Sequence, residues 1–218
     1  MSLPLSSSDR TESLMDWFQL HSRQVIWGSI ALIAVVVGGW FYTRSQQLKA
    51  ERAEAAYFAA QRSVVSGNFP LAESDLRKMI SRYDGAPAAM EGRLALAQVL
   101  YDQSKYQAGI DALKEGEGKL GKSADYGSAV HVLMAAGYEQ LKKLKEAGDE
   151  YDAASKAARF DADRQRYESF AAKDYLSAGD SAKARSIWTV LGADSKGTVA
   201  GEARVRLGEM DAKPEPKA

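Results

Sequence analysis

Residues 88–115 read AAMEGRLALAQVLYDQSKYQAGIDALKE and predict a helical hairpin. Two amphipathic runs, over 88–102 and 106–115, flank a short polar turn. In both runs apolar residues recur at the three- and four-residue spacing that marks one face of a helix. Small residues stand at Ala97 and Gly109, where the two helices must approach each other closely, because a large side chain at either place would force them apart.

The same pattern occurs four times with a period of about 37 residues. Turn signals fall at Gly67, Ser104, Lys142 and Gly179, which are 37, 38 and 37 residues apart. The first helices of the four units are predicted at 53–66, 88–102, 128–141 and 165–178. The second helices are predicted at 70–83, 106–115, 144–158 and 181–191, with a capping helix at 199–210. Small residues recur at the two close-approach positions: Ala97, Ala135 and Ala172 on the first helices, and Ala72, Gly109, Ala147 and Ala184 on the second. The sequence therefore predicts an all-α fold in which residues 43–210 form an α-solenoid of about four hairpins and a capping helix.

Ahead of the repeats, residues 25–42 read VIWGSIALIAVVVGGWFY and carry no charge. At ~1.5 Å per residue this helix would be about 27 Å long, close to the ~30 Å hydrocarbon core of a bilayer. Trp27 lies near one end and Trp40, Phe41 and Tyr42 at the other, as expected of an aromatic belt at the two membrane interfaces. The segment is predicted to be a transmembrane helix.

Two other interpretations of this segment fit its sequence less well. A buried core helix that is apolar on every face would need a large protein around it. A cleaved signal peptide would need a short charged leader and a small-residue cleavage site, but residues 1–24 precede the run and bulky aromatics lie where cleavage would fall. An uncleaved signal anchor is favoured. Its orientation is not decided by the flanking basic residues, which are Arg10 and Arg23 before it and Arg44, Lys49 and Arg52 after it.

The two ends of the chain are polar. Within residues 1–24 a short amphipathic helix is predicted, which could lie on the membrane surface, contact a partner or simply extend the span. Its apolar face would consist of Leu14, Trp17, Phe18 and His21. The C-terminal residues 211–218, DAKPEPKA, are predicted to be a disordered tail.

The repeats resemble the tetratricopeptide repeat, which has a usual period of about 34 residues and this pattern of small and aromatic positions. The whole layout is similar to the bacterial ancillary Sec translocon subunit family. It shares the short helix with Trp17-Phe18, one span ending in Gly-Trp-Phe-Tyr and an Ala/Glu-rich helix over 48–66 that leads into the repeats. The resemblance implies a single-pass protein of the bacterial inner membrane, with a cytoplasmic N-terminus and a periplasmic repeat domain. It also implies partnership with the translocon and periplasmic chaperones, although proteins of other membrane complexes share this architecture.

Composition excludes several functions. The chain of 218 residues has 29 basic and 29 acidic side chains, which argues against a general nucleic-acid binder. It has no Cys, so disulfides, thiolate metal sites and Cys nucleophiles are excluded. The two His, His21 and His131, are far apart in sequence and suggest neither a metal site nor acid–base catalysis. Asp161 and Asp163 lie in a segment with too few ligands for calcium. We therefore expect no catalytic residues, no metal and no cofactor.

Residues 116–123, GEGKLGKS, match the phosphate-loop pattern G-x-x-x-x-G-K-[ST]. In a true phosphate loop Lys122 would contact the β- and γ-phosphates and Ser123 would bind Mg²⁺. Such a loop follows a buried strand, whereas residues 106–115 have helical periodicity. We expect residues 116–123 to form a Gly- and Lys-containing connection between hairpins, with nucleotide binding as the disfavoured alternative.

In a solenoid of this kind the first helix of each unit lines the concave wall. The inward-facing residues mix aromatic, aliphatic and amide groups, which suits an extended peptide or a partner helix. The predicted partner-binding residues are Tyr57, Gln61, Leu94, Gln98, Tyr101, Glu139, Arg166 and Lys173. The alternative is that these residues only solvate the wall while partners use another face.

The sequence thus predicts a non-enzymatic, membrane-anchored interaction scaffold that serves as accessory subunit of an inner-membrane complex. The resemblance favours the translocon and periplasmic chaperone network as its setting. A structural accessory subunit of a photosynthetic or respiratory complex is the first alternative, and a nucleotide-binding protein is the second.

Overall fold

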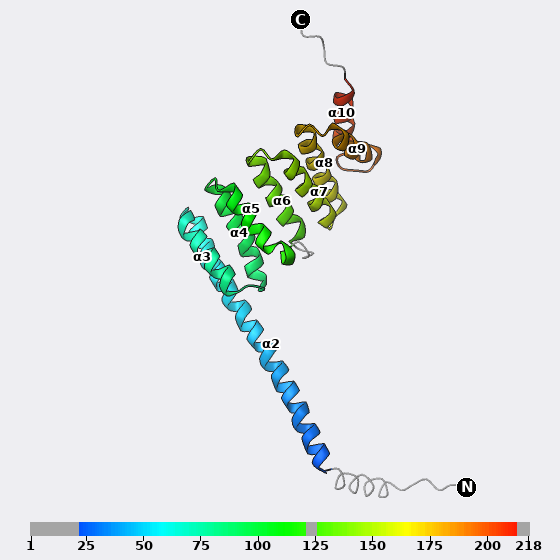
Figure 1. The fold of residues 1–218 in the computed structure, drawn as a ribbon. Helices are drawn as coiled ribbons and strands as arrows, with labels where there is room; N and C mark the ends of the chain where they lie inside the picture. The colour runs from blue at the N-terminus through cyan, green and yellow to red at the C-terminus, as the bar shows by residue number, and fades with distance from the viewer. Residues whose placement is uncertain (1–21, 121–125, 213–218) are drawn as a thin grey trace, which may run out of the picture. The chain divides into compact units, whose positions relative to one another are not determined.

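The computed structural model describes residues 22–120 and 126–212 (Figure 1). The elements in these ranges are all α-helices. In chain order they are α2 (Ser22–Val65), α3 (Phe69–Arg82), α4 (Pro87–Asp102), α5 (Tyr106–Leu120), α6 (Gly127–Gln140), α7 (Leu144–Ala157), α8 (Asp161–Ser177), α9 (Ser181–Ala193) and α10 (Ala200–Asp211). The predicted all-α fold is confirmed. The chain divides into two compact units, residues 1–49 and 50–218.

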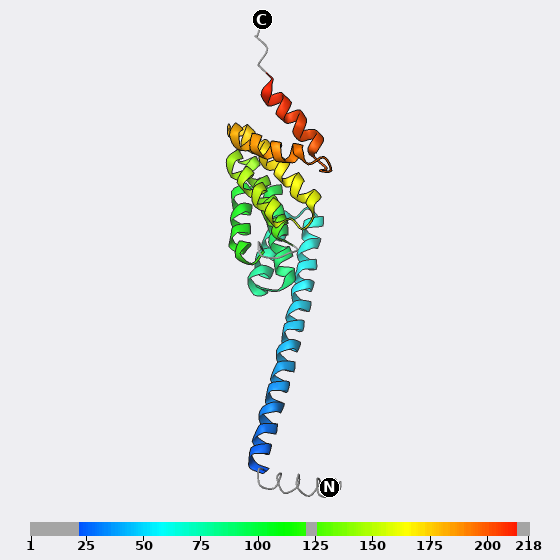
Figure 2. The same cartoon turned by 90° about the vertical axis from the view of Figure 1, so that its right-hand side faces the viewer.

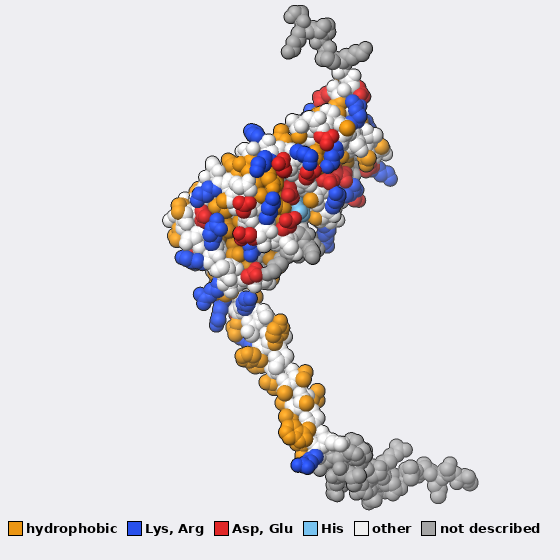
Figure 3. Space-filling view, viewed as in Figure 1, with side chains coloured by type: hydrophobic (Ala, Val, Ile, Leu, Met, Phe, Trp, Pro, Cys, Tyr) orange, Lys and Arg blue, Asp and Glu red, His pale blue; other side chains and the backbone are white. Residues whose placement is uncertain are grey.

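The first unit contains most of the apolar part of α2. This helix has 44 residues and continues without a break through position 43, where the sequence suggested that the repeat domain begins. Its large apolar side chains are exposed, and they gather along this part of the helix in Figure 3. The predicted belt residues Trp27, Trp40, Phe41 and Tyr42 are 65–69% exposed. By length and composition this helix is a candidate membrane anchor.

Two predictions concern the ends of the chain. The predicted amphipathic helix within residues 1–24 lies almost wholly outside the described residues. The predicted disordered tail starts too early, because Asp211 is the last residue of α10. Its carboxylate accepts a hydrogen bond of 2.6 Å from Arg185 of α9, which ties the end of α10 to the repeat unit. Residues 213–218 lie outside the described residues.

In the second unit successive helices pair into hairpins that follow one another in chain order (Figures 1 and 2). The first helices are the end of α2, then α4, α6 and α8. The second helices are α3, α5, α7 and α9, as the repeat pattern predicts. The predicted capping helix is α10, whose Ala203 and Leu207 pack in one cluster with Leu191 of α9. The described residues of this unit therefore form a solenoid of four hairpins and a cap.

The four turns share one backbone geometry. Gly67, Ser104, Lys142 and Gly179 all have positive φ, at 74°, 60°, 60° and 89°. Each amide bonds back to the carbonyl three residues earlier, and the next amide bonds five residues back, as in Lys142 N to Glu139 O (3.0 Å) and Lys143 N to Tyr138 O (2.9 Å). Each helix thus ends at a residue in the left-handed conformation, and the two hydrogen bonds satisfy carbonyls that the last turn of the helix leaves unpaired. It also explains why a turn signal recurs at this position in every unit.

The close-approach positions are buried as predicted. Six of them are alanines with no exposed surface: Ala72, Ala97, Ala135, Ala147, Ala172 and Ala184. At the seventh, Gly109, a Cβ atom would collide with the ring of Tyr101. The larger residues four positions further on fill the space between hairpins and are buried: Leu76, Leu113, Tyr151 and Trp188.

Candidate protein-interaction groove

A groove lies between the first helices of the first three hairpins. Its cavity has a volume of about 530 Å³. Nine residues line it, from the end of α2, from α4 and from α6: Tyr57, Gln61, Val64, Glu91, Leu94, Ala95, Gln98, Val99 and Leu133. The groove therefore brings together four of the residues predicted from the sequence to bind a partner, namely Tyr57, Gln61, Leu94 and Gln98.

The groove presents an apolar wall edged by amide and hydroxyl groups. Gln61 donates a hydrogen bond of 2.6 Å from Nε2 to the hydroxyl of Tyr57, one helical turn away. Gln98 donates a bond of 3.3 Å to Asp102 in the same way. Among the described residues, the side-chain carbonyls of both glutamines accept no hydrogen bond. The groove can therefore bury apolar side chains while offering acceptors to a peptide main chain.

The wall of the groove carries one charged side chain, which is acidic. Glu91 is the charged residue among the nine that line the cavity, and its carboxylate accepts a bond of 2.9 Å from the hydroxyl of Tyr126. On the same helices both acidic residues, Glu54 and Asp102, and basic residues, Arg52 and Arg62, are exposed. The face of the repeat unit seen in Figure 3 has acidic and basic side chains interspersed.

Tyr101 lies behind the groove wall instead of lining it. Its hydroxyl donates a hydrogen bond of 2.9 Å to the main-chain carbonyl of Leu133, which does line the groove. The ring fills the space left by Gly109 and Gly137, where a Cβ atom would collide with it. Burial raises the pKa of the Tyr101 hydroxyl. Tyr101 therefore positions α6 against α4 and supports the wall from behind.

The other three predicted residues lie on the third and fourth hairpins, away from the cavity. Glu139 of α6 is half-buried, and burial raises its pKa while the Tyr151 hydroxyl acts to lower it. Arg166 of α8 is exposed and pairs with Asp163 at 2.8 Å.

Lys173 of α8 contacts the capping helix. Its ammonium pairs with Glu202 of α10 at 2.8 Å. Lys173 therefore holds the cap onto α8 and is not free to bind a partner's carboxylate without giving up this contact.

One buried acidic residue was missed by the sequence reasoning. Asp174 of α8 is 7% exposed, and its Oδ2 atom is buried without a hydrogen bond among the described residues. Burial, and then the charge of Glu139, raise the pKa of Asp174 to about 7. A single aspartate within a charged helix carries no sequence signal of burial, because such residues are usually solvated.

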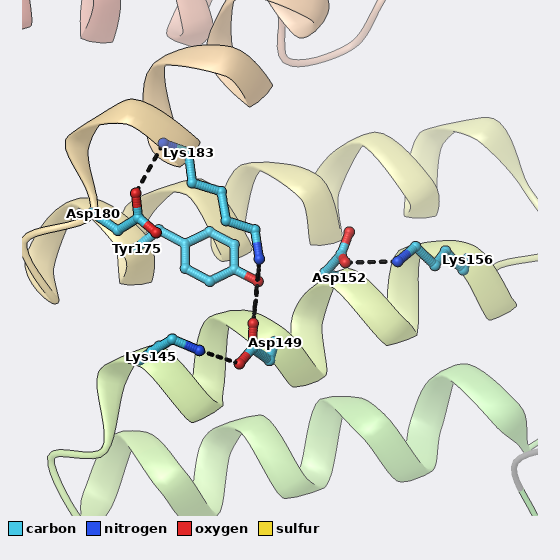
Figure 4. A network of polar contacts seen from close by, with 7 residues as sticks. All are labelled: Lys145, Asp149, Asp152, Lys156, Tyr175, Asp180 and Lys183. Carbon is cyan, nitrogen blue, oxygen red and sulfur yellow. Dashed lines mark hydrogen bonds and ion pairs between the residues drawn. The ribbon is translucent and has the colours of Figure 1, made fainter.

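A polar network joins the third and fourth hairpins (Figure 4). Asp149 of α7 accepts hydrogen bonds from Tyr175 of α8 at 2.8 Å and Lys145 at 3.0 Å. Lys183 of α9 contacts Asp149 at 3.3 Å and donates to the Tyr175 hydroxyl at 2.7 Å. Burial opposes ionisation of Asp149, but these donors hold its pKa below the ordinary value. The network fixes the spacing of α7, α8 and α9.

Part of the segment that matches the phosphate-loop pattern is helical. Residues Gly116 to Leu120 belong to α5, so the connection expected over 116–123 is shorter than predicted and begins after Leu120. The first half of the motif therefore has helical geometry and follows a helix, whereas a phosphate loop follows a strand. Lys122 and Ser123 lie outside the described residues.

His131, Asp161 and Asp163 each contact a side chain of opposite type within the repeat unit. His131 of α6 is half-buried, and its Nδ1 lies 2.8 Å from Glu150 Oε2 of α7, within the third hairpin. Asp161 and Asp163 pair with Arg164 and Arg166 on their own helix. Within residues 22–120 and 126–212 no group of three or more His, Asp or Glu side chains could hold a metal ion.

Stacked hairpins with a shared turn geometry and a groove along their first helices define a helical-repeat protein of the kind that binds other proteins. The family model described as a tetratricopeptide repeat-like domain matches residues 15–123, which is half of the chain. The chain belongs to this family. A comparison with curated proteins found no match.

Proposed function

We propose that the chain is a non-enzymatic, membrane-anchored scaffold that binds a partner protein in the groove of its first three hairpins. The observation that carries this proposal is the 530 Å³ cavity with its apolar wall and amide edge. A groove of this chemistry suits either an extended peptide, through alternate side chains and main-chain bonds, or one face of an amphipathic helix. Burial of the partly exposed Leu94 and Leu133 against apolar side chains of the partner would provide the main stabilisation.

The membrane anchor is the first half of α2. An apolar segment of this length that is exposed on all sides supports insertion into a bilayer, because in water it would leave a large apolar surface unburied. The proposed topology places the N-terminus in the bacterial cytoplasm and the repeats in the periplasm. This orientation rests on the similarity of layout to ancillary Sec translocon subunits.

The proposed setting is an accessory role in the translocon and periplasmic chaperone network. It rests on the same similarity of layout, since a repeat fold by itself does not identify its guests. A structural role in a photosynthetic or respiratory complex would use the same anchor and the same solenoid. The two settings differ in what accompanies the protein in its native membrane.

The test is a pull-down of the full-length protein from its native membrane in mild detergent, with mass spectrometry of the proteins that co-purify. Wild type is compared with Leu94→Glu and Gln98→Glu in the groove, and with Leu71→Glu on α3 as the control. Leu71 is 46% exposed and lies outside the groove. Loss of the same proteins in both groove variants, with retention in the control, is expected.

The possible outcomes test two things separately: whether the groove binds the partner, and which membrane complex the partner belongs to. Translocon subunits or chaperones among the lost proteins would support the proposed setting. A stoichiometric energy-converting complex would replace it with structural support of that complex. Co-purification that is unchanged in both groove variants would show that partners use another face.

A further inference from the structure

The part of α2 that belongs to the second unit has one buried side and one exposed side. The buried side packs in the first hairpin, where Ala53 and Ala60 have no exposed surface. The residues on the opposite side are all exposed, and they are Glu51, Ala55, Phe58, Arg62 and Val65. Phe58 is 64% exposed and Val65 is 85% exposed. The repeat unit therefore leaves large apolar side chains of its first helix in solvent.

This exposed side of α2 is the outer face at the start of the solenoid. Helices inside a solenoid are covered by the hairpins before and after them, and a terminal helix needs a polar outer face to stay in solution. At the other end α10 provides the cover, since its Ala203 packs in one cluster with Leu191 of α9. Exposed apolar side chains that gather on one face of a helix mark an interaction surface.

The spacing of these residues indicates what the face binds. From Glu51 to Val65 the steps alternate between four and three residues. This average of 3.5 residues keeps one side of a helix against another helix in a coiled coil. Because α2 is one helix of 44 residues, the same alternation can be followed back along it. The positions it reaches are Leu48, Arg44, Phe41, Val37, Ala34, Ile30 and Trp27. A helix with this pattern fits a helix that has the same pattern.

We propose that this face of α2 pairs in parallel with the same face of a second copy of the chain. The inference rests on the proposed membrane anchor, because two copies inserted in one membrane with the same orientation present α2 in parallel and in register. A twofold pair of this kind uses one self-complementary surface on both copies. None of its residues in the second unit lines the groove, so pairing and partner binding use different surfaces.

The charged residues of the face fit a parallel pair. Each residue at the seam of a coiled coil inserts between four residues of the facing helix. Glu51 would thus lie beside the exposed Arg52 of the second copy, and the reverse, which gives two symmetric pairs of opposite charge. Arg62 can cover the seam with its apolar stem and keep its charge in water. Phe58 and Val65 would lose their exposure to water, which stabilises the pair.

The first test is disulfide cross-linking of the full-length protein in membranes. The chain has no Cys, so one introduced Cys reports on pairing without background. Ala55→Cys lies on the proposed face, and Ala59→Cys is the matched control because both are exposed alanines of α2, one turn apart. Mild oxidation should give about tenfold more covalent dimer with Ala55→Cys, because a disulfide needs the two Cα atoms within about 7 Å.

The second test is sedimentation equilibrium of the purified full-length protein in detergent. Phe58→Glu places two like charges opposite each other in the proposed pair and should raise the dissociation constant of the dimer roughly 100-fold. Val190→Glu is the control, because Val190 of α9 is 67% exposed and lies on another helix. It should leave the dissociation constant unchanged. Both substitutions replace exposed side chains, and circular dichroism of each variant verifies that it folds.

Several results would overturn the pairing. Equal cross-linking of the two Cys variants would reflect random collisions, and a dimer that persists in Phe58→Glu would use another surface. A monomeric wild type from which Phe58→Glu removes a different protein in the pull-down would assign the face to that protein. Extraction of the membranes with alkaline carbonate tests the anchor separately, because an inserted protein stays in the pellet whether or not it pairs.

Discussion

The ring of Tyr101 in α4 occupies the space that a side chain at position 109 in α5 would need. A Cβ atom added to Gly109 would lie within the van der Waals radius of that ring. The hydroxyl of the same tyrosine reaches the carbonyl of Leu133 at 2.9 Å, so one side chain sets the spacing within its own hairpin and to the next. Because Leu133 lines the groove, the shape of the groove depends on this contact.

Gly109→Ala is therefore expected to lower the free energy of unfolding by about 1–3 kcal/mol, as overpacking of a core does. Gly118→Ala, in the same helix, is the control because nothing lies within 4 Å of the added Cβ atom. It should instead raise stability by about 0.5–1 kcal/mol, through the better helix propensity of alanine. Denaturant unfolding of the full chain in detergent measures both. Equal effects of the two substitutions would refute the close approach at Gly109.

The four turns allow a test of backbone strain. Ser104 and Lys142 adopt the left-handed conformation that glycine adopts at Gly67 and Gly179. A residue with a Cβ atom is disfavoured there by roughly 1–2 kcal/mol. Lys142→Gly should therefore stabilise the protein by about 1 kcal/mol, and Gly179→Ala should destabilise it by a similar amount. The midpoints of thermal unfolding of the two variants should move in opposite directions, and a shift of both in the same direction would contradict the shared geometry.

Much of this fold is predictable because its determinants are local. The turn residues, the seven small positions and the 37-residue period could be read from the sequence, since each reflects a contact between helices that are adjacent in the chain. Tyr101 was assigned to the concave face by its helical position, but the absence of side chains at Gly109 and Gly137 allows it to turn inward. The position of the Tyr101 ring depends on α4, α5 and α6 together, whereas helical periodicity predicts only which face of a single helix a residue occupies.

The connection after the second hairpin was misjudged for a different reason. Glycines are common at helix ends, so Gly116 and Gly118 suggested that α5 ends before them. In the structure α5 continues through both glycines to Leu120, because glycine weakens a helix interior by only about 0.5–1 kcal/mol and does not by itself end the helix. The burial of Asp174 also has no signal in the sequence, because it depends on how α8 packs within the repeat unit.

The raised pKa of Asp174 predicts how stability depends on pH. The pKa is about 7 in the folded protein, against an ordinary value of 3.8. Between these values the folded state holds a proton that the unfolded state has lost, so stability falls as the pH rises from about 4 to about 7. Below about pH 4 the carboxyl is protonated in both states, so it adds no pH dependence to the stability. Above about pH 7 it is ionised in both states, and the folded state bears the full cost of burying the charge.

Asp174→Asn should remove this dependence, because the amide does not ionise. Its midpoint of thermal unfolding is expected to exceed that of wild type by a few degrees at pH 8 and to approach it at pH 4.5. Glu146→Gln serves as the control for loss of one exposed carboxyl. Parallel pH profiles of wild type and Asp174→Asn would contradict burial of an ionisable Asp174.

The network at Asp149 makes a separate prediction about how the last hairpin is held (Figure 4). Asp149 bonds across helices to Tyr175 and Lys183, whereas Asp152 pairs with Lys156 of its own helix at 2.7 Å. Ion pairs between exposed side chains one turn apart contribute only about 0.3–0.5 kcal/mol. The Asp149 side chain is 46% exposed, but it accepts a hydrogen bond from the hydroxyl of the fully buried Tyr175. Its loss leaves that buried donor without its acceptor, which costs about 1–3 kcal/mol.

Asp149→Ala is therefore expected to destabilise the full chain by about 1–3 kcal/mol, and Asp152→Ala by less than about 0.5 kcal/mol. Since the pKa of Asp149 is lowered, its contribution is present above the ordinary pKa of an aspartate and is lost as the pH falls through the lowered value. The difference between the two variants should thus shrink in acid. Hydrogen exchange locates the effect: amides of α9 and α10 should exchange faster in Asp149→Ala, while those of α3 and α4 keep their wild-type rates. A uniform increase along the chain would show that the network acts on global stability and does not specifically hold the last hairpin.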